Sequence, residues 1–273
     1  MANIGSAGAT DLTAKIVTRG AVTVFAAVTG LVVGSFLNVV VYRVPRGLSV
    51  VKPPSFCPHC DTRVRPIDNV PVLSWLFLHG KCHQCRGRIS IRYPLVELAT
   101  GLVFAAVGWG LGPHWAVPGF CVLAATLVAL VAVERDGLAP PLSVAVIGTA
   151  IAVALLIAAG AADHRWAHVV GLAIGVLAAI VVIIAGRRLH LVEAAPWKGS
   201  VPVVLPVAAA LGWLGPAYVA EGLATTIVAL LVIRTFGRQR VPDHHPGVLG
   251  AALAGGVVVA TIVAVALGSG AGT

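Results

Sequence analysis

Residues 57–85 read CPHCDTRVRPIDNVPVLSWLFLHGKCHQC, and they lie inside the one long polar stretch of a chain that is otherwise apolar. The chain has 273 residues, of which 58% are hydrophobic and only 11% are charged, and its mean hydropathy is +0.96. So few polar residues cannot cover the surface of a water-soluble protein of this size. The composition therefore predicts a membrane protein that carries one small polar insert.

The apolar segments are long enough to cross a bilayer, because a hydrocarbon core of about 30 Å needs roughly 20 helical residues. We therefore expect an all-α polytopic membrane protein with about eight transmembrane helices. Their expected positions are 20–42, 94–111, 117–134, 139–160, 167–186, 201–216, 218–233 and 247–267. The expected divisions are 1–42 (an outer N-terminal tail and the first helix), 43–93 (the cysteine insert) and 94–273 (a bundle of about seven helices).

The net charge of +9 reflects membrane topology. With eight spans, all 19 lysines and arginines except Lys15, Arg19 and Arg165 fall on loops of the same side. Such a bias marks the cytoplasmic side of a membrane protein. We therefore expect a cytoplasmic cysteine insert, both termini outside, the lipid bilayer as a partner and no nucleic-acid partner.

Four cysteines of the insert form two pairs of the type C-x-x-C, Cys57 with Cys60 and Cys82 with Cys85. Two such turns supply the four soft ligands of a tetrahedral structural zinc site. A disulfide is disfavoured on a reducing cytoplasmic side, which leaves redox-active or unmetallated thiols as the alternative. An insert of this size has little core of its own, so a bound zinc would stabilise it by about 10 kcal/mol or more.

Three segments together resemble one known family. They are GSFLNVVVYRVP (34–45), CPHC (57–60) and NVPVLSWLFLHGKCHQCRGRISIRYPLVELATG (69–101). This pattern, over roughly residues 30–107, resembles the N-terminal half of the type IV prepilin leader peptidases. The resemblance implies a bacterial inner-membrane protein whose cytoplasmic zinc-type insert follows the first span.

The resemblance also implies an activity. In that family, membrane-embedded aspartates cleave a short basic leader from pilin and pseudopilin precursors, and many members then methylate the new N-terminus with S-adenosylmethionine. An aspartic peptidase needs two adjacent carboxylates that share one proton. The candidate positions in this chain should therefore hold two aspartates.

The first family aspartate, at the cytoplasmic end of the third span, corresponds to Glu134 in VERDGLAPPL. Glutamate keeps the acid but moves it about one methylene outward, and a misplacement near 1 Å can cost roughly a hundredfold in rate. Asp136 is a second candidate, whose spacing fits less well. An ordinary polar turn at the membrane surface is the alternative interpretation of both residues.

The second family aspartate, in G-x-G-D, corresponds to Ser200 in EAAPWKGSVPVV. A serine hydroxyl cannot share the proton of the pair, because its pKa lies far above that of a carboxylate. Glu193 is the nearby acid that could substitute, although it also fits a solvated loop. Glu97, one turn into the second span, should be hydrogen-bonded or functional, because an unpartnered acid is costly inside a membrane. The pair His244–His245 fits a turn, with a metal site as the alternative.

Two hypotheses follow from these positions. In the first, the chain is a pseudoenzyme that has lost proteolysis and binds or assembles pilin-type or pseudopilin-type precursors. In the second, it is a working membrane endopeptidase that uses Glu134 or Asp136 with an unrecognised second acid. In either case S-adenosylmethionine would be a cofactor if methyl transfer is retained.

Overall fold

The computed structural model describes residues 4–188 and 201–214, and the regular structure of this part is helical, with two isolated β-bridges in the insert. The α-helices are α1 (Ile4–Arg43), α2 (Leu73–Phe77), α3 (Arg92–Leu111), α4 (Val117–Arg135), α5 (Leu142–Ala162), α6 (Trp166–Arg188) and α7 (Val201–Leu214). Short 3-10 turns lie at Val44–Arg46 and Pro66–Asn69. The all-α prediction is confirmed for these residues.

Four of these helices, α1, α3, α4 and α5, are long and apolar enough to cross a membrane. They coincide with the first four predicted spans. α6 contains a shorter apolar helix, Trp166–Val181, and α7 has 14 residues with Pro206 inside it. The predicted spans 218–233 and 247–267 lie outside the described residues, so the total of eight stays a prediction.

α1 is longer than the first predicted span, because it begins at Ile4 rather than near residue 20. The apolar run marks only the part of the helix that suits hydrocarbon. Before that run, Lys15 and Asp11 form an exposed ion pair at 2.8 Å, four residues apart on one helical face. Such pairs support a helix in water, so the segment predicted as a tail is helical.

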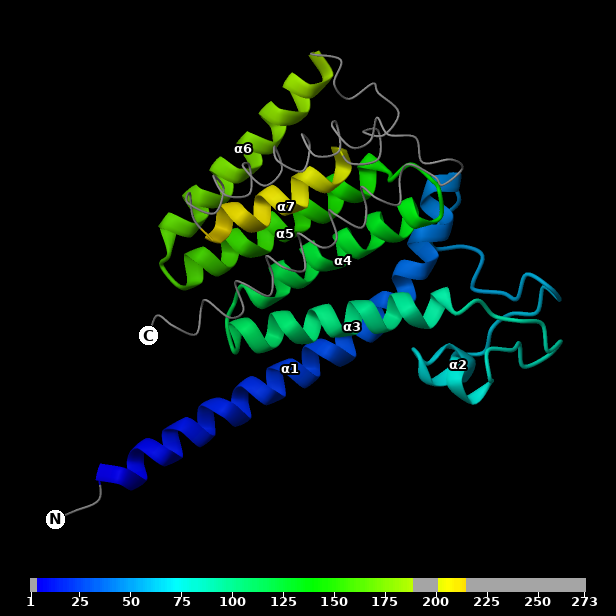
Figure 1. Cartoon of the computed structure of the whole chain (residues 1–273), viewed down its shortest axis with the longest axis horizontal. Coiled ribbons are helices and arrows are strands. Elements are labelled where there is room, and N and C mark those ends of the chain that lie inside the picture. The colour runs from blue at the N-terminus through cyan, green and yellow to red at the C-terminus, as the bar shows by residue number, and fades with distance from the viewer. Residues whose placement is uncertain (1–3, 189–200, 215–273) are drawn as a thin grey trace, which may run out of the picture.

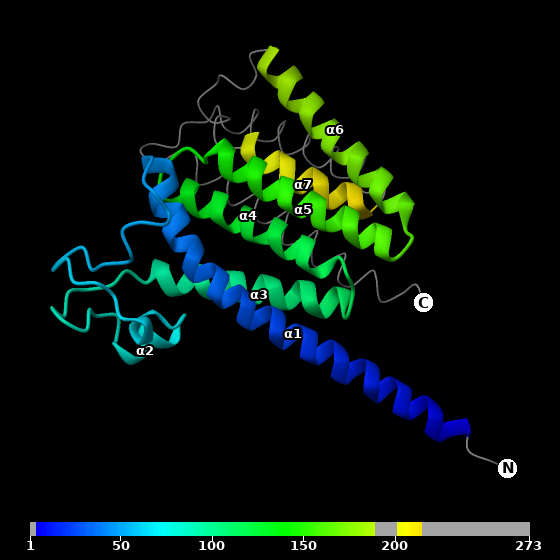
Figure 2. The same ribbon diagram turned by 180° about the vertical axis from the view of Figure 1, so that it is seen from behind.

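The helices form one bundle with the insert at one end (Figures 1 and 2). α3 packs along α1, α4 packs on α3 and α5, and α6 packs against α7 at the outer side. α4 lies at the centre, where Leu123 and Leu130 are almost completely buried. α4 runs back toward the insert, so its last residues lie at the insert end of the bundle.

Small residues let the backbones of α1 and α3 approach closely. A Cβ added at Gly34 would lie 2.7 Å from the Cα of Glu97, and one added at Gly30 would lie 2.9 Å from the Cα of Gly101. Gly30 and Gly34 form a G-x-x-x-G pattern, which is typical of close helix pairs in membranes. At the insert end, the side-chain amide of Asn38 donates to the Tyr93 carbonyl at 3.1 Å.

Replacing Gly34 with alanine should therefore force α1 and α3 apart. Overpacking of this kind costs about 1–3 kcal/mol, so Gly34→Ala should lower the apparent melting temperature in detergent. Gly20→Ala is the matched control, because a Cβ at Gly20 meets nothing within 4 Å. Equal melting temperatures for the two variants would contradict this packing.

Candidate functional site

The four insert cysteines lie on two turns of the same construction. In the first turn the Cys57 N–H donates to the Thr62 carbonyl at 2.9 Å, and in the second the Cys82 N–H donates to the Gly87 carbonyl at 2.8 Å. An isolated β-bridge closes each turn, and the residue after each second cysteine has a positive φ. The bridges are Phe56–Arg63 and Lys81–Arg88, and the positive-φ residues are Asp61 (52°) and Arg86 (58°).

The two turns bring all four sulfurs together. The Sγ atoms of Cys57, Cys60, Cys82 and Cys85 lie within 4.8 Å of one another, and those of Cys57 and Cys85 are 3.8 Å apart. The cysteines are free thiols. A tetrahedral zinc with Zn–S bonds of about 2.3 Å places its sulfurs about 3.8 Å apart. The donor set therefore fits structural zinc.

At two of the four cysteines, local hydrogen bonds favour the thiolate form that a metal needs. The side chain of Thr62, followed by its backbone, lowers the pKa of the Cys60 thiol to about 6. Backbone N–H groups of Cys85 and Gln84 lower the pKa of Cys82. Since the thiolate is the metal ligand, the hydrogen bonds at Cys60 and Cys82 favour binding of a soft cation.

The candidate acids Glu134 and Asp136 lie where α4 ends, on the same side of the bundle as the insert. Glu134 is buried, with 7% of its surface exposed. Within the described residues, no hydrogen bond or ion pair joins its carboxylate to another side chain. Asp136 follows as the C-terminal cap of α4, and Gly137, with φ 73°, then reverses the chain.

Asp136 has a cationic neighbour that sequence reasoning did not identify. The Arg92 guanidinium, at the start of α3, lies 3.2 Å from its carboxylate, although this Nη2 atom lacks hydrogen-bond geometry with any partner. The two residues are 44 positions apart in sequence. Nothing in the sequence indicates which of the basic residues at the insert end of the bundle pairs with Asp136. The third candidate, Ser200, and the substitute acid Glu193 lie outside the described residues.

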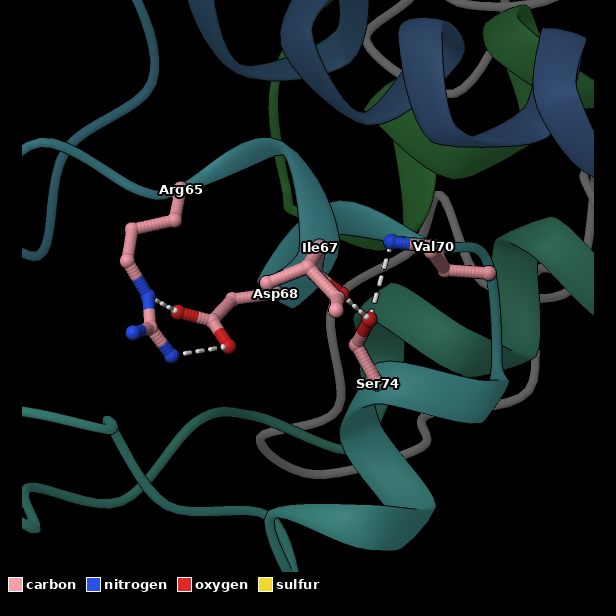
Figure 3. A network of polar contacts seen from close by, with 5 residues as sticks. All are labelled: Arg65, Ile67, Asp68, Val70 and Ser74. Atoms are coloured by element: carbon pink, nitrogen blue, oxygen red, sulfur yellow. Dashed lines mark hydrogen bonds and ion pairs between the residues drawn. The ribbon is translucent and has the colours of Figure 1, made fainter.

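Glu97 has the partner that its position in α3 requires. It is 8% exposed, and its carboxylate accepts the Val72 N–H at 2.7 Å. Val72, with φ 61° and ψ −49°, is a β-branched residue in a strained conformation directly before α2. The side chain of Ser74 holds the preceding turn, accepting the Val70 N–H and donating to the Ile67 carbonyl (Figure 3). Glu97 therefore anchors the insert to the membrane helix.

Comparison with known proteins finds relatives for the N-terminal part of the chain. Residues 28–111 match the model of the bacterial peptidase A24 N-terminal domain. The prepilin leader peptidase/N-methyltransferase of Neisseria gonorrhoeae is 42% identical over 135 residues, which are 41% of this chain and 47% of that protein. The protein of the same name from Myxococcus xanthus is 44% identical over 154 residues, or 56% of this chain and 46% of that one. No solved structure matches the chain.

Through its N-terminal part, the chain is similar to the type IV prepilin leader peptidases. A further relative, 40% identical over 136 residues, is the type 4 prepilin-like proteins leader peptide-processing enzyme of Escherichia coli. The matched region contains the last part of α1, the four-cysteine insert and α3. The chain spans about half the length of these curated relatives.

Protein purified without added metal should contain about one zinc per chain, because four thiolates complete a tetrahedral site. Cys57→Ser removes the buried ligand of the cluster and should abolish tight binding, while the membrane helices keep their backbone hydrogen bonds. Elemental analysis and circular dichroism measure the two effects.

The matched control is Cys121→Ala, which removes the fifth cysteine, buried in α4 away from the cluster, and should leave the zinc content unchanged. Less than about a tenth of an equivalent of zinc in the unaltered protein would contradict the metal site.

Proposed function

We propose that the chain is a prepilin-peptidase-like membrane protein that has lost efficient proteolysis and that binds, or helps to assemble, pilin-type or pseudopilin-type precursors. It is a multi-pass membrane protein of the bacterial inner-membrane type, with its cysteine insert cytoplasmic and both termini outside. The zinc site stabilises the insert. S-adenosylmethionine is its methyl donor if methyl transfer to the precursor is retained.

One observation carries this proposal. Among the described residues, which do not include Glu193 or Ser200, no ion pair or hydrogen bond joins either candidate acid to a second carboxylate, and Asp136 lies beside the Arg92 guanidinium. In an aspartic peptidase one carboxyl group activates water while the other donates to the carbonyl oxygen of the substrate. Without a second carboxylate beside it, Glu134 can supply only one half of this chemistry.

The sequence at the second family position supports the same conclusion. Ser200 stands where the second aspartate is expected, and a hydroxyl does not titrate in the range of a carboxyl group. A positioned general acid or base contributes about 10²–10⁴ in rate. Loss of one member of the pair is therefore sufficient to make cleavage too slow to process a precursor.

The second candidate function is an active leader endopeptidase. The buried carboxylate of Glu134 favours it, because this group lies at the insert end of the bundle, where the family pattern places the first catalytic acid. Such an enzyme would need a second acid, with Glu193 as the candidate from the sequence.

The unaltered protein in detergent should cleave a panel of prepilin-type precursors feebly or not at all. Replacing both candidate positions, Glu134→Asp with Ser200→Asp, should raise cleavage, because the pair of carboxylates is then restored. Cleavage and methyl incorporation are followed together by mass spectrometry.

Robust cleavage by the unaltered protein that Glu134→Gln or Asp136→Asn abolishes would overturn the pseudoenzyme proposal and establish the second candidate. Asp11→Asn is the control for loss of a carboxylate, because Asp11 is exposed and pairs only within its own helix.

The proposed orientation predicts which ends of the helices are reached from outside the cell. A membrane-impermeant thiol reagent should label Arg165→Cys, at the start of α6, in intact cells. Arg135→Cys, also at an exposed arginine but at the other end of the bundle, should be labelled only after the cells are permeabilised. The reverse pattern would contradict the cytoplasmic assignment of the insert.

A further inference from the structure

The short helix α2 presents an apolar face that no described residue covers. Leu73, Leu76 and Phe77 stand at positions i, i+3 and i+4 and therefore share one side of the helix. All three are exposed, Phe77 by 78%. The exposed Ile67 and Val70, in the turn before α2, extend the apolar surface. We call these five residues the α2 patch.

The other side of α2 faces the insert. The indole N–H of Trp75 donates to the Ile89 carbonyl at 3.1 Å, and its ring lies over Gly80. The buried Ser74 holds the turn that precedes the helix. The α2 patch is therefore the outer face of a well-fixed segment, and it needs an apolar environment from outside the insert.

The anchor to Glu97 sets the depth of this segment. α3 has 20 residues and a length of about 30 Å, which is also the thickness of the hydrocarbon core. Its first residue, Arg92, therefore lies at the membrane boundary. Glu97 follows five residues later, about 7.5 Å further along the helix axis. Because the Val72 N–H bonds to the Glu97 carboxylate, the chain just before α2 lies beside the first turns of α3, at the membrane boundary.

The charge of the insert suits the same location. Residues 43–92 contain nine lysines and arginines against two acids, Asp61 and Asp68, and Asp68 is already paired with Arg65 (Figure 3). Basic residues next to a membrane gain about 1 kcal/mol each from anionic lipids. An apolar face beside basic side chains is the composition of segments that lie in the membrane interface.

We propose that the α2 patch is a membrane anchor, inserted into the lipid at the boundary between head groups and acyl chains. Interfacial helices bury their apolar face about 5–10 Å into this boundary, and the bond to Glu97 holds the start of α2 beside it. The anchor holds the four-cysteine site flat against the bilayer, beside the ends of α3 and α4.

Photocross-linking tests this proposal in the full-length protein. The chain is reconstituted into nanodiscs of phosphatidylcholine and phosphatidylglycerol, with p-benzoylphenylalanine in place of Phe77. Phospholipid adducts are then measured by mass spectrometry. Leu102, which is 62% exposed in the middle of α3, is the positive control position, and Arg63, exposed in the first cysteine turn, is the negative control.

The probe at Phe77 should give on the order of tenfold more lipid adduct than the probe at Arg63 and a yield similar to that at Leu102, because an inserted side chain contacts acyl chains. The zinc content of each variant shows that the insert is folded, and the probe at Leu76 repeats the test if the Phe77 variant is not. A lipid yield equal to that at Arg63, or a cross-link to another part of the chain or to a second copy, overturns the proposal.

Discussion

The contact between the backbones of α1 and α3 is the constraint on which the rest of the structure depends. With glycine at positions 30, 34 and 101, the two helices approach more closely than any larger residue allows. This contact fixes where the chain leaves α1 and where it re-enters α3. The α1–α3 contact therefore holds the two ends of the insert close together, independently of the cysteine cluster. Near this contact, the Glu97 carboxylate of α3 accepts a hydrogen bond from the Val72 N–H of the insert.

The same contact links the two halves of the candidate site. The start of α3 carries Arg92, whose guanidinium approaches Asp136 at the end of α4. The cysteine turns are attached to α3 through Val72. A shift of α3 would therefore move the thiolate cluster and the carboxylates together, although they come from separate parts of the sequence.

Much of this architecture could be predicted from the sequence, because its signals are local. Runs of apolar residues located the first four spans, and the spacing of Cys57, Cys60, Cys82 and Cys85 predicted a cluster that the geometry reproduces. The need of a membrane acid for a partner predicted that Glu97 would be hydrogen-bonded. The position of Glu134 at a helix end followed from the length of the third span.

The remaining features depend on tertiary contacts or on backbone groups. Arg92 and Asp136 are far apart in sequence, so no local pattern pairs them. The partner of Glu97 is a backbone N–H, which every residue except proline offers, and its identity could not be read from side chains. The early start of α1 was missed because hydropathy reports preference for lipid and not helical continuity.

The length of α1 has a mechanical consequence. Its 40 residues make a rod of about 60 Å, twice the thickness of the hydrocarbon core. To fit inside, the rod would have to tilt by about 60°, well beyond the usual range of about 0–40°. The first turns of α1, with the Asp11–Lys15 pair, therefore extend beyond the hydrocarbon as a helix. Because α3 packs along the membrane part of α1, a change in the tilt of this rod would also shift the helix that carries Arg92 and Glu97.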